Sequence, residues 1–137
     1  MTYQVEAIAA RVKVLLAQQL GRFENNAIAV WIEPPHAPAT KARSGLQVIF
    51  NRIPTPKAPP SVAGAQIDRW MSVEFTLTQF DSTVEGVEAM NKAIEILKAN
   101  FPLIEVVPLP LKEGYLPKAS CSIPYHEITN LSTQFIA

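Results

Sequence analysis

Residues 66–80, QIDRWMSVEFTLTQF, limit the choice of fold more than any other part of the sequence. Apolar and polar side chains alternate along this stretch, which is the pattern of a β-strand with one buried face. Arg69 interrupts the apolar face near its start. The apolar members of that face are Ile67, Met71, Val73, Phe75 and Leu77. A strand of about 15 residues exceeds the usual length of five or six, so we expect it to extend beyond its neighbours or to bend.

A helix is predicted directly after this strand. Ser82 is followed three residues later by Glu85, a spacing typical of a capping box, in which each side chain binds a backbone N–H group at the helix start. Apolar residues then recur at helical spacing, and Pro102 ends the pattern. These positions are Val87, Met90, Ile94, Leu97 and Phe101.

The remaining elements complete the order α-β-β-β-α-β-β. A first helix is expected at residues 4–20, where apolar residues fall on one face before Gly21. Strands are expected at residues 27–34, at residues 46–53, at residues 103–107, and at least once within residues 119–135. This order predicts an α+β fold in a single domain, residues 1–137. A mixed, mostly antiparallel β-sheet would pack against two helices and carry long proline-rich loops.

The stretch NRIPTPKAPPSVAG, residues 51–64, lies between two expected strands and contains four prolines: Pro54, Pro56, Pro59 and Pro60. It is not a linker between domains, because one helix and two short strands before it could not bury a core. A polyproline ligand is an alternative, since Pro56 and Pro59 form one PxxP match. We interpret the stretch as a semi-stiff extended arm that projects from a single domain and whose prolines reduce the entropy lost on docking. In the last strand, Pro124 should lie at an edge or a break.

The charges favour these loops as an interface. The 12 basic and 12 acidic residues balance, whereas a protein that neutralises phosphates is usually basic overall. No acidic residue occurs between Glu33 and Asp68. The candidate interface residues in that interval are Lys41, Arg43, Arg52, Lys57, Pro56, Pro59 and Pro60. They could meet an acidic protein surface or pass near nucleic acid, or they could be solvated loops whose charges serve solubility.

The sequence contains no recognisable catalytic, cofactor or metal motif. His36 lies between prolines, and His126 and Glu127 should point to opposite faces of a strand, which makes them a poor pair for base catalysis. Cys121 has no positive or helix-terminal neighbour to activate it and is expected to be a half-buried strand residue. As the single cysteine, it excludes an internal disulfide and a cysteine zinc site. We therefore expect no enzymatic activity and no cofactor. No apolar run is long enough for a membrane span.

Two segments carry a resemblance to a known family. The first is the amphipathic opening VEAIAARVKVLLAQQL, and the second is MSVEFTLTQFDSTVEGVEAMNKAIEILKANF. Together with the long loops between strands, they resemble the tail terminator, or tail completion, proteins of long-tailed bacteriophages and the related cap proteins of contractile injection systems. In that family a long strand ends in a similar Leu-Thr-x-Phe/Tyr stretch and leads into a helix. The residues in comparable places here are Leu77, Thr78, Phe80, Ala89, Met90, Ile94 and Leu97.

The resemblance implies a structural virion protein. Such proteins form a ring, commonly a hexamer, that caps the completed tail tube, stops its polymerisation and joins the tail to the head or neck. The implied partners are further copies of the chain, the tail tube and sheath proteins, and a neck or head-completion protein. The protein would be assembled in the host cytoplasm, with DNA present only as lumen contents and no membrane partner. Alternatives are another neck or baseplate adaptor of a phage-like particle, and a small nucleic-acid-binding module that uses the four cations.

Overall fold

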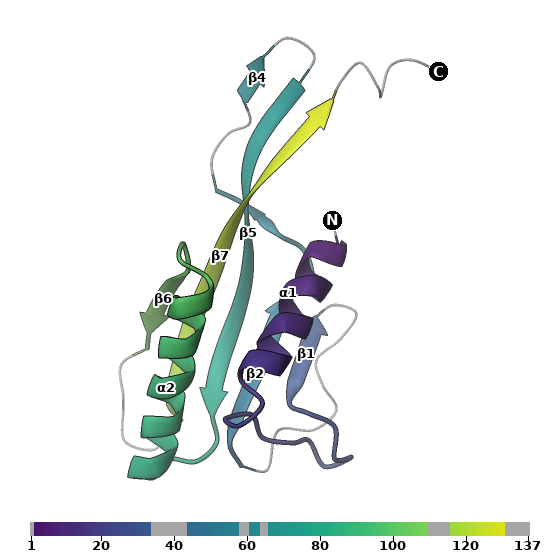
Figure 1. The fold of residues 1–137 in the computed structure, drawn as a ribbon. Helices are drawn as coiled ribbons and strands as arrows, with labels where there is room; N and C mark the ends of the chain where they lie inside the picture. The colour runs from purple at the N-terminus through teal and green to yellow at the C-terminus, as the bar shows by residue number, and fades with distance from the viewer. Residues whose placement is uncertain (1, 34–43, 58–60, 64–65, 110–115, 131–137) are drawn as a thin grey trace.

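The computed structural model describes residues 2–33, 44–57, 61–63, 66–109 and 116–130. It has the α+β fold expected from the sequence, a mixed β-sheet covered on one face by two helices (Figure 1). The helices are α1 (Thr2–Leu15) and α2 (Val84–Asn100). The main strands are β1 (Val30–Glu33), β2 (Leu46–Asn51), β5 (Gln66–Gln79), β6 (Glu105–Pro108) and β7 (Lys118–Asn130). Two short strands, β3 (Thr55–Pro56) and β4 (Ser61–Ala63), lie between β2 and β5 in the chain.

The central strand of the sheet is β5, and the strand order is β1-β2-β5-β7-β6. β1 runs parallel to β2, and the other pairs are antiparallel. β7 pairs with nearly all of β5, from Gln66 opposite Asn130 to Thr78 opposite Lys118. The other edge of β5 is bordered in turn by β2, β3 and β4. The long strand thus extends past each of its shorter neighbours, as its length predicts.

The core lies between the helices and the sheet face that they cover. Val48 lies opposite Leu77 and Phe50 opposite Phe75, and directly paired residues point to the same face of a sheet. The two phenylalanine rings stack with their centroids 4.6 Å apart. The helices contribute Val5, Ala9, Val12, Met90, Ala93 and Leu97, and Leu16 adds to the core just after α1. The predicted apolar face of β5 is therefore the core face from Val73 onward.

The start of α2 differs from the prediction by one residue. Thr83, not Ser82, is the N-cap, and its Oγ1 accepts a hydrogen bond from the Gly86 N–H group at 3.3 Å. Asp81 holds Thr83 in place, because its carboxylate accepts from the Thr83 N–H group at 3.0 Å and from the Thr83 hydroxyl at 2.6 Å. Glu85 is therefore one position too early in the helix to close the predicted capping box.

The first helix also ends earlier than predicted, at Leu15 rather than at residue 20. Beyond it the chain turns toward the sheet. The Gly21 N–H group donates to the Leu46 carbonyl at 2.9 Å, and the Leu46 N–H group donates to the Gln19 carbonyl at 3.2 Å. Residues 16–19 form a turn, and the chain then pairs with the start of β2 instead of continuing the helix.

The described part of the proline-rich stretch follows the edge of β5 and does not project from it. Thr55 lies opposite Ser72, and the Lys57 N–H group donates to the Trp70 carbonyl at 2.9 Å. Because hydrogen-bonded and non-bonded positions alternate in an antiparallel pair, Pro56 falls where no donor toward β5 is needed. The stretch is a connection inside one domain, as predicted, but its described strands β3 and β4 lie along the edge of β5 and do not stand free as an arm. The segment that projects beyond the helices is the ribbon of β5 and β7, with β4 along the β5 edge (Figure 1).

Pro124 lies at an edge of the sheet, as predicted. The Leu109 N–H group donates to the Lys118 carbonyl at 2.9 Å, so even-numbered residues of β7 point their backbone groups toward the β6 side. β6 pairs with β7 only as far as Ser122. The missing N–H group of Pro124 would therefore face away from β5, and no hydrogen bond between the two long strands is lost.

Candidate interaction surface

The sheet face opposite the helices, called here the outer face, contains a hollow of about 660 Å³. Every main strand contributes side chains to it, and strand register brings them together. Ile49 lies opposite Thr76, and Glu105 lies opposite Ser122. The side chains of the hollow belong to Glu33, Ile49, Asn51, Glu74, Thr76, Glu105, Val107, Ser120 and Ser122. The surface thus combines carboxylates, hydroxyls and apolar groups.

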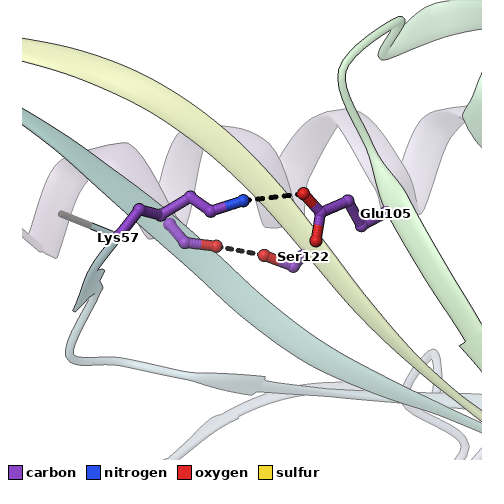
Figure 2. A network of polar contacts seen from close by, with 4 residues as sticks. Lys57, Glu105 and Ser122 are labelled. Atoms are coloured by element: carbon purple, nitrogen blue, oxygen red, sulfur yellow. Dashed lines mark hydrogen bonds and ion pairs between the residues drawn. The ribbon is translucent and has the colours of Figure 1, made fainter.

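An ion pair borders this hollow. Lys57 extends its side chain across β5 and β7 to Glu105 on β6, with 2.7 Å between Nζ and Oε1 (Figure 2). Nearby, the hydroxyls of Ser72 and Ser122 form a hydrogen bond between β5 and β7. The ion pair is partly exposed, so it should contribute no more than about 1 kcal/mol to stability. It shows, however, that the outer face accommodates a cationic side chain.

The charged residues that line the hollow are all carboxylates: Glu33, Glu74 and Glu105. They come from β1, β5 and β6, so they span the full width of the sheet. Within the described residues, Glu105 has Lys57 as its ion-pair partner, and no ion pair forms at Glu33 or Glu74. The hollow therefore has negative charge that the described cations do not balance locally.

A second part of the surface is the ribbon, which consists of residues 66–72 of β5 and 124–130 of β7. On its outer face Trp70 lies opposite His126, with the ring centroids 5.0 Å apart. The Asp68 carboxylate contacts Nε2 of His126. Trp70 is 44% exposed, so the ribbon presents a large aromatic surface to solvent.

The ribbon also has an open strand edge. No described strand borders β7 from Pro124 to Asn130 on the side away from β5. The even-numbered residues of this section point their backbone groups toward that edge, and only Pro124 lacks a donor there. Edges of this kind pair readily with other chains unless they are protected.

The end of the outer face away from the ribbon is covered by a small apolar cluster. Phe23 packs edge-on against Trp31, with ring centroids 6.4 Å apart and an interplanar angle of 87°. Ala29 and Phe80 complete the cluster. Among the described residues, this cluster borders the outer face at the end away from the ribbon.

The two predicted basic interface residues that the structure describes, Arg52 and Lys57, do not come together. Arg52 pairs with Glu6 of α1, with 3.2 Å between Nη1 and Oε1, on the helix side of the sheet. Lys57 pairs with Glu105 over the outer face. Pro56 is exposed in β3. Lys41, Arg43, Pro59 and Pro60 lie outside the described residues.

The carboxylates of the hollow were not among the predicted interface residues. Strand alternation places Glu74 on the polar face of β5, which is a signal available in the sequence. Nothing in the sequence gives the register that aligns it with Glu33 on β1 and Glu105 on β6. Their common position depends on strand order, which only the folded sheet provides.

The groups considered for catalysis occupy ordinary structural positions where they are described. Cys121 is 3% exposed, more deeply buried than expected, and burial raises the pKa of its thiol to about 12. His126 packs on Trp70 in the ribbon, and His36 is outside the described residues. In the described part of the chain, no three His, Cys, Asp or Glu side chains are grouped so as to hold a metal ion.

No protein-family model matches the chain, and the comparison with curated proteins also found no match. Neither α1 nor α2 has the length and apolar character that crossing a membrane requires, among the residues described. Fold and surface together define an α+β domain with one sheet face closed by helices and, among the described residues, a hollow on the other face.

Proposed function

We propose that this protein is a ring-forming tail terminator of a phage-like particle. Its ring, hexameric by analogy with the family it resembles, would cap the completed tail tube, stop tube polymerisation and join the tail to the neck. The role is structural and involves no catalysis. The observation that carries the proposal is the β5–β7 ribbon, which projects beyond the helices with an open edge.

A ring of identical subunits needs two different patches on each subunit that fit one another. The ribbon supplies one patch. The backbone groups of His126, Ile128 and Asn130 face an edge that no described strand occupies, and a neighbouring subunit could satisfy them by strand pairing. Strand pairing with an identical neighbour would also protect an edge that otherwise favours aggregation.

Exposed apolar side chains around the ribbon and hollow support the same role. Trp70, Val107 and Leu109 are exposed on β5, on β6 and just beyond β6, and tryptophan is enriched among residues that dominate binding energy at interfaces. The charged fraction of the chain is 18%, below the roughly 25% of typical domains. Such a surface is suited to partial burial in an assembly.

The described basic residues do not support the alternative of a nucleic-acid-binding module. Arg52 and Lys57 already pair with carboxylates, and they do so on opposite sides of the sheet. A single phosphate backbone could not contact both without breaking these pairs. The alternative of a neck or baseplate adaptor would use the same kind of surface. Only its location in the particle distinguishes it from a terminator.

Purified protein mixed with terminator-free tail tubes would test the proposal. We expect a ring-sized mass by sedimentation and caps at the head-proximal tube ends in negative-stain images. Trp70→Ala should reduce capping, whereas Val84→Ala, at an exposed apolar residue of α2, should not. A monomer that never binds tube ends would refute the proposal, and label at the head-distal end would assign the protein to the baseplate.

A further inference from the structure

We infer that the hollow on the outer face binds a basic, proline-rich segment of a second copy of this chain, residues 34–43 with Lys41 and Arg43. The inference rests on the proposed ring and names the contact between its neighbouring subunits. It assigns the hollow a ligand chemistry: an extended peptide carrying two cations.

The hollow has the size and the lining of a peptide-binding surface. Its volume of about 660 Å³ falls within the roughly 300–1,000 Å³ typical of ligand sites. Ile49 and Val107 provide apolar contact, and Ser120 and Ser122 provide hydroxyls. Extended segments bind sheets through such alternating contacts, and prolines lower the entropy lost when they do.

The negative charge of the hollow indicates that it binds a basic segment. The charged side chains in the hollow are carboxylates from three strands, and no described cation pairs with Glu33 or Glu74. The chain as a whole has equal numbers of basic and acidic residues, so negative charge on this face is matched by cations elsewhere in the same sequence. The interval between Glu33 and Asp68 has no acidic residue and contains Lys41 and Arg43.

The chain already contains one example of the proposed contact. Lys57 crosses the outer face and places its ammonium group 2.7 Å from the Glu105 carboxylate (Figure 2). The residue comes from the same acid-free, proline-rich interval as Lys41 and Arg43. A cationic side chain from this type of segment therefore has a demonstrated binding geometry at the rim of the hollow.

The chain enters residues 34–43 from one edge of the sheet, and the hollow extends from that edge to the other. Residues 34–43 follow β1, which is one edge strand, whereas Glu105 and Val107 belong to β6, which is the other. In a head-to-tail ring the β1 side of one subunit would face the β6 side of the next. This arrangement is the one that a heterologous ring contact requires.

A peptide-binding experiment isolates the contact. The receptor is the full-length Lys41→Glu/Arg43→Glu variant, whose own segment cannot compete, and the probe is a fluorescent peptide of residues 34–45, PPHAPATKARSG. We expect saturable binding by anisotropy that weakens with salt. Adding Glu74→Lys to the receptor should weaken binding by about tenfold or more, whereas Glu88→Lys, on the exposed side of α2, should leave it unchanged.

A charge exchange in the intact protein provides the second measurement. Glu74→Lys should reduce self-association in sedimentation experiments, and combining it with Lys41→Glu and Arg43→Glu should restore part of it. Circular dichroism confirms that each variant is folded. The inference would be overturned if the peptide did not bind the receptor, or if it bound the receptor carrying Glu74→Lys equally strongly.

The outcomes separate this inference from the proposed function. Peptide binding by a protein that never caps tail tubes would support the contact and refute the terminator role. Normal capping by the Glu74→Lys variant would support the terminator role and overturn the contact.

Discussion

Gly86 illustrates how one backbone contact fixes the identity of a residue. A Cβ atom at this position would overlap the Asp81 carbonyl oxygen and lie 2.7 Å from the Asp81 Cγ atom. The Gly86 carbonyl also accepts a hydrogen bond from the Gln79 side chain at 3.0 Å. The absence of a side chain therefore lets the end of β5 and the start of α2 approach each other closely.

We expect Gly86→Ala to destabilise the fold by roughly 1–3 kcal/mol, although alanine ordinarily stabilises a helix interior by about 1 kcal/mol relative to glycine. The loss follows because the backbone of Asp81 must move away. Urea unfolding measures the change, with Glu88→Ala on the exposed face of α2 as the control. A variant as stable as the wild type would show that the turn adapts without cost.

Cys121 gives a prediction that depends on pH. Burial raises the pKa of its thiol from the ordinary value of 9.0 to about 12, because the core disfavours the thiolate. Its contribution to stability is complete below pH 9.0 and is lost as the pH rises toward 12. We expect the free energy of unfolding of the wild type to fall more steeply above pH 9.0 than that of Cys121→Ala. Parallel curves for the two proteins would contradict this account.

Among the elements, α2 depends on a cap that the sequence pattern predicts at Ser82. The structure assigns the cap to Thr83, which Asp81 orients through two hydrogen bonds. The same bonds hold the pKa of the Asp81 carboxylate below its ordinary value. This stabilisation is present above that value and is lost as the pH falls through the lowered pKa.

Thr83→Ala should destabilise the protein by about 0.5–2 kcal/mol, the usual cost of removing an N-cap side chain. Ser82→Ala should have little effect, because no cap bond involves Ser82. Thermal and urea unfolding of the two variants give the comparison. A larger loss for Ser82→Ala would place the cap where the capping-box pattern predicts it.

Strand β5 changes its role along its length. From Val73 to Leu77 its inward side chains are buried under the helices, and this part holds the core together. From Gln66 to Ser72 it forms the ribbon with β7, and Trp70 on the outer face is exposed. The length that the alternating pattern predicts thus comprises one section in the core and one section in the ribbon.

At the scale of the whole molecule, the two sheet faces differ in what they are able to bind. The inner face is occupied by α1 and α2. The outer face combines the carboxylates of the hollow with the aromatic surface of the ribbon. A neighbouring subunit could therefore be held by both electrostatic attraction and apolar burial.

We expect self-association to depend on salt. Raising the salt concentration from about 0.1 M to 1 M shortens the Debye length from about 10 Å to 3 Å, which screens exposed charges. The average mass in sedimentation velocity experiments should fall over this range, while circular dichroism stays constant. A mass that rises with salt would instead indicate an interface dominated by apolar contacts.

The candidate surface was only partly predictable from the sequence. The acid-free interval was visible, but the structure places Arg52 and Lys57 over opposite faces and pairs each with a carboxylate. The location of the projecting part was also misjudged, because proline content does not indicate whether an extended segment stands free or lies along an edge. Pairing with β5 decides this, and pairing is a long-range property.

Local patterns in the sequence determined the two helices, the main strands, the α+β class and the core face of β5. These features depend on side-chain periodicity within one segment, which needs no partner to be recognised. The tertiary structure alone decided the strand order, the alignment of Glu33, Glu74 and Glu105, the cap at Thr83 and the open edge of β7. Each of these depends on which distant segments pair and in what register, and that choice is made by the packing of the whole chain.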